Sequence, residues 1–210
     1  MLSLINKQFI KAAQDNQLDE LKSLLSQGAD IHNDNALRTA ACGHLEIVKL
    51  LVTQGANIHA ADDNALRFAA CYGYLEIAKF LLIHGANVHA DDDYALRWAA
   101  QFGHLETVKF LVTQGANIHA NDDGALREAA DEGHLEVFKF LITKGANIHV
   151  NDDEIFKTAT KNKNEPISRL LNAFLIEEKL LVAASDSTSA SSCLCGMLHP
   201  QPLPITKAKR

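Results

Sequence analysis

The sequence DDDYALRWAAQFGHLETVKFLVTQGANIHA occupies residues 91–120, and it recurs in register along the chain. Glycines followed by Ala-Asn lie 30 residues apart, and a second series of glycines keeps the same period. The first series is Gly55, Gly85, Gly115 and Gly145, and the second is Gly73, Gly103 and Gly133. A fixed period of this length is typical of repeat architectures, in which each unit is one small supersecondary element.

The pattern within residues 91–120 predicts two short antiparallel helices and a loop. Apolar residues recur at i, i+3 and i+4 within 95–100, and again within 105–112, as expected for the buried stripes of two helices. Gly103 and Gly115 are placed to end these helices, since glycine readily adopts the left-handed conformation of a helix stop. One such pair cannot bury its apolar face alone, whereas stacked neighbours can. We therefore expect an all-α solenoid of stacked helix-loop-helix units.

These motifs resemble the ankyrin repeat, which has Thr-Pro-Leu-His before a pair of alanines, then Gly-His, an apolar run and Gly-Ala-Asp. Each unit here has 30 residues rather than the family's usual length of about 33. The loss lies in the loop before the first helix, so we expect short loops instead of projecting hairpins. The matching segments, within roughly residues 1–180, are Ala65-Leu66-Arg67, Ala69-Ala70, Gly103-His104-Leu105-Glu106 and Gly115-Ala116-Asn117.

The 30-residue form with Ala-Leu-Arg is also similar to the ankyrin arrays encoded by giant viruses of amoebae, such as Mimivirus. That resemblance implies a viral protein that acts in the host cytoplasm on a host protein.

The repeats divide the chain into an array with two end caps and a tail. Residues 1–32 are a degenerate first unit with a polar outer face, as a terminal repeat requires. Residues 151–184 form a last unit that closes the other end. Residues 185–210 are polar and low in complexity, so we expect them to be disordered. Between the caps, residues 33–150 hold four ankyrin repeats over 33–60, 61–90, 91–120 and 121–150, and the shortened first of these predicts a shorter first helix.

Composition and motifs limit the function. The net charge of −6 at pH 7 argues against nucleic-acid binding, because phosphate contacts need a basic surface. No run of 18 apolar residues occurs, so no segment is expected to cross a membrane. The N-terminus lacks a signal-peptide core, which predicts a cytoplasmic rather than secreted protein. We also expect a monomer without cofactor or enzymatic activity, since neither a glycine-rich phosphate loop nor a His-Glu-x-x-His motif is present.

The positions that vary among otherwise near-identical units are the candidate partner-binding residues. The pairs Phe68/Tyr72 and Trp98/Phe102 are spaced i,i+4, so each pair shares a helix face. Together with Tyr94 they predict an aromatic patch, and tyrosine and tryptophan are favoured anchors at interfaces. For Phe68 and Trp98 packing between repeats is an alternative, because ankyrin repeats often have a core leucine there. Acidic residues border this patch, namely Glu128, Asp131 and Glu132.

One histidine recurs at the same position of five units and invites a metal hypothesis. Packed helices lie about 8–10 Å apart, whereas a Zn–N bond is about 2.0–2.1 Å, so successive histidines cannot readily share an ion. We interpret each imidazole as a hydrogen-bond partner of the adjoining loop backbone. A response to pH stays open, since the reference pKa of histidine is about 6.5. The five residues are His32, His59, His89, His119 and His149.

Acidic residues and an arginine also recur in the central units. Carboxylates such as those of Asp91 to Asp93 favour the first turn of a helix, so we expect the first helices to begin there. An arginine such as Arg97 can bridge to carboxylates of its own unit or the next, and repetition in every unit favours a structural role. Cys42 and Cys71 occupy equivalent positions and are interpreted as reduced packing residues.

These patterns predict a non-catalytic module that binds a protein through the inner helical face and loop tips. One alternative is an adaptor or scaffold whose tail, residues 185–210, binds a second partner, as in substrate adaptors of ubiquitin ligases. Another is a pH or metal sensor that uses the recurring histidines.

Overall fold

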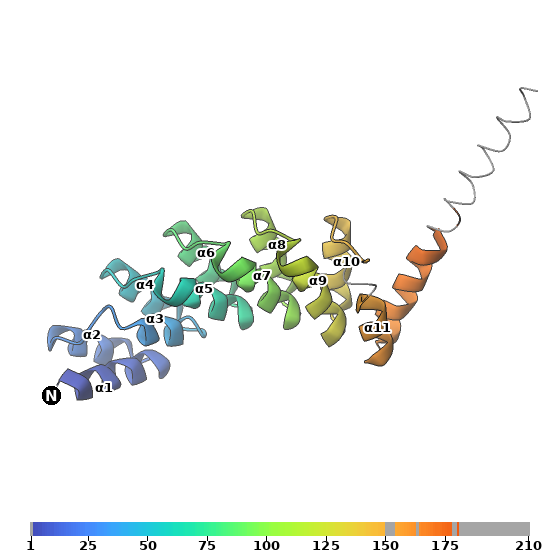
Figure 1. The fold of residues 1–210 in the computed structure, drawn as a ribbon. Coiled ribbons are helices and arrows are strands. Elements are labelled where there is room, and N and C mark those ends of the chain that lie inside the picture. Colours follow the sequence, from blue (N-terminus) through green and yellow to red (C-terminus); the bar gives the residue numbers. More distant parts are fainter. Residues whose placement is uncertain (1, 150–153, 163, 178–179, 181–210) are drawn as a thin grey trace, which may run out of the picture. The chain divides into compact units, whose positions relative to one another are not determined.

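The computed structural model describes residues 2–149, 154–162, 164–177 and 180. All regular elements within these residues are helices, which follow one another in pairs joined by short loops (Figure 1). They are α1 (Leu2–Gln14), α2 (Leu18–Ser26), α3 (Asp34–Ala40), α4 (Leu45–Thr53), α5 (Ala60–Cys71), α6 (Leu75–Ile83), α7 (Ala90–Gln101), α8 (Leu105–Thr113), α9 (Ala120–Glu132), α10 (Leu135–Thr143) and α11 (Glu154–Lys161), and residues 165–177 are also helical. The all-α repeat solenoid predicted from the sequence is confirmed, whereas the predicted tail over 185–210 lies outside the described residues.

The helices of the compact unit Met1–Ser168 form two rows (Figure 1). Each first helix packs on the first helix of the next repeat, in the order α1, α3, α5, α7, α9 and α11, and α4, α6, α8 and α10 pack in the same order in the second row. The first helices meet through small side chains, and Ala69 and Ala99 are fully buried. The second helices contribute larger ones, such as the fully buried Leu81 and Leu111. The core therefore continues from repeat to repeat, as a stacked array requires.

The first helices α5, α7 and α9 do not begin as the sequence predicted. Residues 61–63, 91–93 and 121–123 all have φ between 48° and 55°, which makes each triplet a left-handed turn before the right-handed helix. For residues other than glycine this conformation costs about 1–2 kcal/mol each, so other contacts must hold it. In contrast, α3 has only 7 residues and no left-handed turn before it. It begins with a conventional N-cap, in which the Asn33 side chain accepts a hydrogen bond from the Asn35 N–H. The predicted shortening of this helix is confirmed.

The recurring arginine binds the carbonyl groups of the left-handed turn. The Arg67 guanidinium donates to the Ala61 carbonyl oxygen at 2.9 Å, and that of Arg127 donates to the Asn121 carbonyl oxygen at 3.0 Å. Arg67 also forms an ion pair with Asp91 of the next repeat. The arginines therefore have the structural role that the sequence predicted. The contact that recurs is a hydrogen bond to a backbone carbonyl group, however, and not the predicted bridge to carboxylates.

The second helices α6, α8 and α10 each begin with a side chain packed over a glycine of the preceding repeat. The Nε2 atom of His104 lies 2.9 Å from the carbonyl oxygen of Cys71. Gly73 has φ +72°, and a Cβ atom added there would lie 2.5 Å from Nδ1 of His104. Glycine is thus required at this position both for its backbone conformation and for the close approach of the imidazole. No helix of the described residues is long and apolar enough to cross a membrane.

Candidate protein-binding surface

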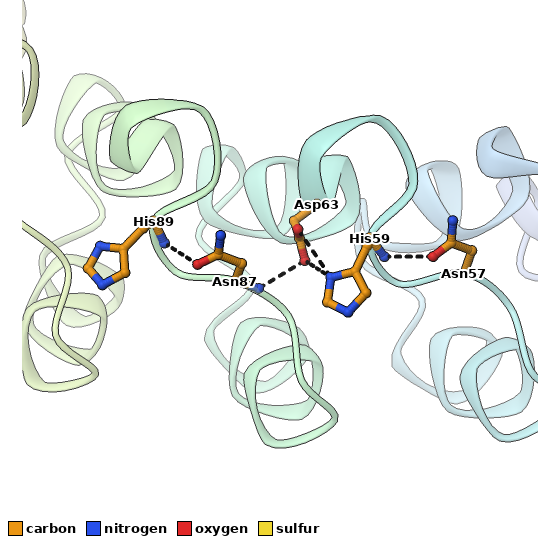
Figure 2. A network of polar contacts seen from close by, with 5 residues as sticks. All are labelled: Asn57, His59, Asp63, Asn87 and His89. Atoms are coloured by element: carbon orange, nitrogen blue, oxygen red, sulfur yellow. Dashed lines mark hydrogen bonds and ion pairs between the residues drawn. The ribbon is translucent and has the colours of Figure 1, made fainter.

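The recurring loop histidine belongs to a polar ladder that links neighbouring repeats (Figure 2). The Asn87 backbone N–H donates to Oδ1 of Asp63 at 2.9 Å, across the repeat boundary. Nδ1 of His59 lies 3.2 Å from the same carboxylate oxygen, and Oδ1 of Asn87 accepts from the His89 backbone N–H at 3.0 Å. The next two repeats form the same bonds around Asp93 and Asp123.

This ladder corrects the interpretation of the histidines. In His59, His89 and His119 the imidazole contacts a buried aspartate carboxylate instead of the loop backbone, and the loop N–H is bound by an asparagine side chain. The aspartate is 4% exposed in Asp63 and Asp93, so these donors bind oxygen atoms that water hardly reaches. Within the described residues no group of three or more potential metal ligands occurs. Hydrogen bonding between neighbouring repeats is therefore enough to explain why the histidine recurs.

Four of the predicted aromatic residues lie in one continuous series of ring contacts. The rings of Phe68 and Trp98 meet edge to face with centroids 5.5 Å apart, which joins α5 to α7. Tyr94 packs against Trp98 at 4.7 Å, and Tyr72 against Phe68 at 6.3 Å. Tyr72 in turn lies 6.3 Å from Tyr74, which the sequence analysis did not name. We refer to Tyr94, Trp98, Phe68, Tyr72 and Tyr74 as the aromatic row.

Exposure divides the candidate residues into two groups. Tyr72 and Phe102 are 52% and 50% exposed, although large apolar side chains of the same helices are buried. Phe68, Trp98 and Tyr94 are half-buried. Packing between repeats, the alternative for Phe68 and Trp98, is thus present, but both rings keep part of their surface open. Phe102 occupies the position of Tyr72 one repeat later and is outside the ring contacts found in the described residues.

Tyr74 is the member of the row that sequence reasoning missed. It is 40% exposed and occupies the position where other repeats have a histidine, such as His104. Its ring lies over Gly43, where an added Cβ atom would be 2.9 Å from Cζ of the tyrosine. The sequence does indicate this residue, because Gly73-Tyr74 replaces the Gly-His pair that the neighbouring repeats have.

Arginine side chains lie against two members of the aromatic row, Tyr94 and Phe68. The Arg97 guanidinium lies 4.2 Å from the centroid of the Tyr94 ring, and that of Arg67 lies 5.5 Å from it. Arg38 lies 5.3 Å from the Phe68 ring centroid. Such cation–π contacts contribute about 0.5–1 kcal/mol at exposed sites. Two guanidinium groups therefore lie close to Tyr94, whereas Tyr72 and Tyr74 are the exposed members of the row.

The acidic residues lie on α9, one repeat beyond Trp98. Glu128 is half-buried, Asp131 is half-buried and Glu132 is exposed. Burial raises the pKa of the Glu128 carboxyl, and the neighbouring charges of Asp131 and Glu132 raise it further, against the opposing effect of Arg127 and Arg97. The Glu128 carboxyl therefore keeps its proton to a higher pH than an exposed glutamate does.

Comparison with protein families agrees with this architecture. The model of ankyrin repeats (3 copies) matches residues 9–92 and again residues 66–152. A comparison of the sequence with curated proteins finds no match. Ankyrin repeats are generally protein–protein interaction modules and are typically non-catalytic. With most of its length matched by this model, and with stacked helix pairs over the same residues, the chain belongs to the ankyrin-repeat family.

Proposed function

We propose that this chain is a non-catalytic module that holds a partner protein against the aromatic row and Phe102. The observation that supports this proposal most strongly is the exposure of Tyr72 and Phe102, at about half of each side chain, at two positions that vary between repeats. Constant residues such as Asp63 and His104 bond to neighbouring repeats. The exposed aromatic side chains have no comparable stacking role, and aromatic residues are enriched in the energetic centres of interfaces.

The mechanism is recognition by a surface that is ordered before binding. The aromatic row is held by ring contacts between repeats and by cation–π contacts with arginines. A surface that is already ordered loses little conformational entropy on binding, which favours affinity. Each repeat presents equivalent positions, so exchanging a few side chains changes the partner without altering the stack.

The resemblance to the arrays of giant amoebal viruses supports a host protein as the partner and the host cytoplasm as the location. An amoebal lysate is therefore a suitable source for a pull-down, in which the bait is compared with a Tyr72→Ala/Phe102→Ala double variant. Ile83→Ala is the matched control, because Ile83 is an 80% exposed apolar residue at the end of the second helix α6. Circular dichroism and a thermal melt establish that all three proteins are folded.

The expected result is a protein that is retained by the wild type and by Ile83→Ala and lost by the double variant. Retention of the same protein by the folded double variant would place the binding surface elsewhere. A double variant that melts far below the wild type would mean that Tyr72 and Phe102 stabilise the array itself. For the adaptor alternative, deleting residues 185–210 should remove one partner and leave the other.

A further inference from the structure

One boundary between repeats lacks a hydrogen bond that the other boundaries have. At each of the others, the side chain at the start of a second helix is bonded to a backbone carbonyl oxygen of the preceding unit. At the boundary between units 33–60 and 61–90, which we call the second boundary, Tyr74 occupies this place, and its hydroxyl has no hydrogen-bond partner among the described residues. The bonds at the other boundaries join His44 to Gln14 at 2.8 Å, His104 to Cys71 at 2.9 Å, His134 to Gln101 at 2.9 Å, and Asn164 to Ala130 at 2.6 Å.

The polar ladder is also interrupted beside the second boundary. From α5 to α10, the backbone N–H of each loop asparagine donates to an aspartate of a left-handed turn, as Asn87 does to Asp63. The equivalent group before α5 is the Asn57 backbone N–H, and it has no acceptor in the part of the chain that the structure describes. The cause lies in α3, which begins without a left-handed turn and so lacks the aspartate that the turn carries. The loop that leads into α5 is therefore not tied to α3.

The helix contact at the second boundary is shorter as well. On this side α5 packs on α3, which has 7 residues, whereas on its other side it packs on α7, which has 12. The stability of a stacked array is approximately a sum of terms for the units and terms for the interfaces between neighbours. Fewer hydrogen bonds and a shorter helix contact both reduce the interface term of the second boundary.

The two sides of the second boundary differ in their ability to stay folded alone. Helices α1 to α4 belong to two units, a cap and a shortened repeat, whereas about three repeats are needed for a stable array. Helices α5 to α10 form three complete repeats, which keep the polar ladder and two of the histidine bonds. Proteins open locally in cooperative units of different stability. Loss of the second boundary therefore unfolds the first side and leaves the second side folded.

We propose that α1 to α4 open as one cooperative unit at the second boundary, which gives the aromatic row a closed and an open form. In the closed form the Tyr74 ring lies over Gly43, and the Arg38 guanidinium lies 5.3 Å from the centroid of the Phe68 ring. Both contacts cross the second boundary, so the open form releases Tyr74 and Phe68 from them. This opening is a property of the chain itself and goes beyond the proposed function. A partner that contacts both sides of the boundary would hold the closed form, because it binds that form alone.

Native-state amide hydrogen exchange of the full chain, measured by mass spectrometry at increasing urea concentration, tests the proposal. Amides of α1 to α4 should share one opening reaction and exchange about tenfold faster than those of α5 to α8, as expected for the loss of one or two hydrogen bonds. A gradual increase in protection from α1 to α8, without a step at the second boundary, would overturn the proposal.

Two reciprocal substitutions test the cause of the step. Tyr74→His introduces the imidazole that the neighbouring boundaries have, and it should raise the protection of α1 to α4 by about tenfold. His104→Tyr removes the bond to Cys71, so it should lower the protection of α5 and α6 towards that of α1 to α4. Tyr72→His is the matched control, because the ring contacts of Tyr72 with Phe68 and Tyr74 stay within one unit, and it should leave the step unchanged. A step that is the same in Tyr74→His and His104→Tyr as in the wild type would overturn the proposal.

Discussion

Replacing the buried aspartate of the polar ladder should destabilise the array by a predictable amount. In Asp93→Ala the Asn117 backbone N–H loses an acceptor 2.8 Å away, across the boundary between two repeats. His89 loses a contact of 3.1 Å with the same oxygen, Oδ1. Asp93 is 4% exposed, so water cannot easily replace the missing acceptor.

The magnitude follows from these two contacts. A hydrogen bond to a charged acceptor contributes about 1.5–3 kcal/mol. The His89 side chain is 55% exposed, so its contact with the carboxylate is screened by solvent and adds about 0–1 kcal/mol. We therefore expect Asp93→Ala to lower the free energy of unfolding by about 2–4 kcal/mol. Asp93→Asn keeps an acceptor oxygen and loses only its charge, so its cost should be about 1 kcal/mol.

Asp92→Ala is the control, because it changes the adjacent residue of the same left-handed turn. Both aspartates have positive φ, 52° for Asp92 and 55° for Asp93, so alanine carries the same backbone penalty at each. The Asp92 side chain is exposed, and it has no hydrogen-bond partner among the described residues. Urea unfolding followed by circular dichroism and by Trp98 fluorescence measures all three variants. Equal losses for Asp92→Ala and Asp93→Ala would refute the role of the ladder and attribute the whole effect to the turn.

Three further perturbations have defined outcomes. Gly103→Ala should lower the melting temperature more than Gly115→Ala, because both glycines have positive φ but only a Cβ at Gly103 would meet another group, Nδ1 of His134 at 2.5 Å. Burial raises the pKa of Glu128, so the folded state favours the protonated carboxyl, and stability falls as rising pH ionises it. Glu128→Gln should therefore raise the melting temperature at pH 7, and the gain should vanish in acid, where the wild-type carboxyl is protonated. Burial also raises the pKa of the Cys71 thiol, so its alkylation by iodoacetamide, followed by peptide mass spectrometry, should be slow at neutral pH and accelerate at a higher pH than for an exposed cysteine.

The fold could be predicted from the sequence because each repeat has the same residue types at the same structural positions. A buried alanine such as Ala99 and a glycine such as Gly103 recur at a fixed period, and each copy confirms the others. The left-handed turn at 91–93 could not be read in the same way. Carboxylates at that place normally indicate the start of a right-handed helix, and the contacts that hold the turn come from Arg97 and from the next repeat.

The candidate site was less accessible to sequence reasoning for a related reason. Whether Phe68 is core or surface depends on the residue that faces it from the next repeat, and the structure gives it an edge-to-face contact with Trp98 while leaving both half-buried. The exposure of Tyr72 and Phe102 could be anticipated, because the resemblance to ankyrin repeats implies exposed positions there on the inner face. Tyr74 was accessible only by comparing the Gly-His position across units, where it replaces a histidine.

The polar ladder explains how this array can vary its surface without losing its stack. The bonds of Asp63 to His59 and Asn87 lie in the loops, at the end of the first helix opposite Tyr72. Stacking by the ladder therefore uses none of the exposed aromatic side chains. The sequence has a glutamate at the position equivalent to Phe102 one repeat later, while Asp93 and Asp123 keep the same hydrogen bonds to the next repeat. The ladder and the side chains proposed to bind a partner thus lie at opposite ends of the first helices.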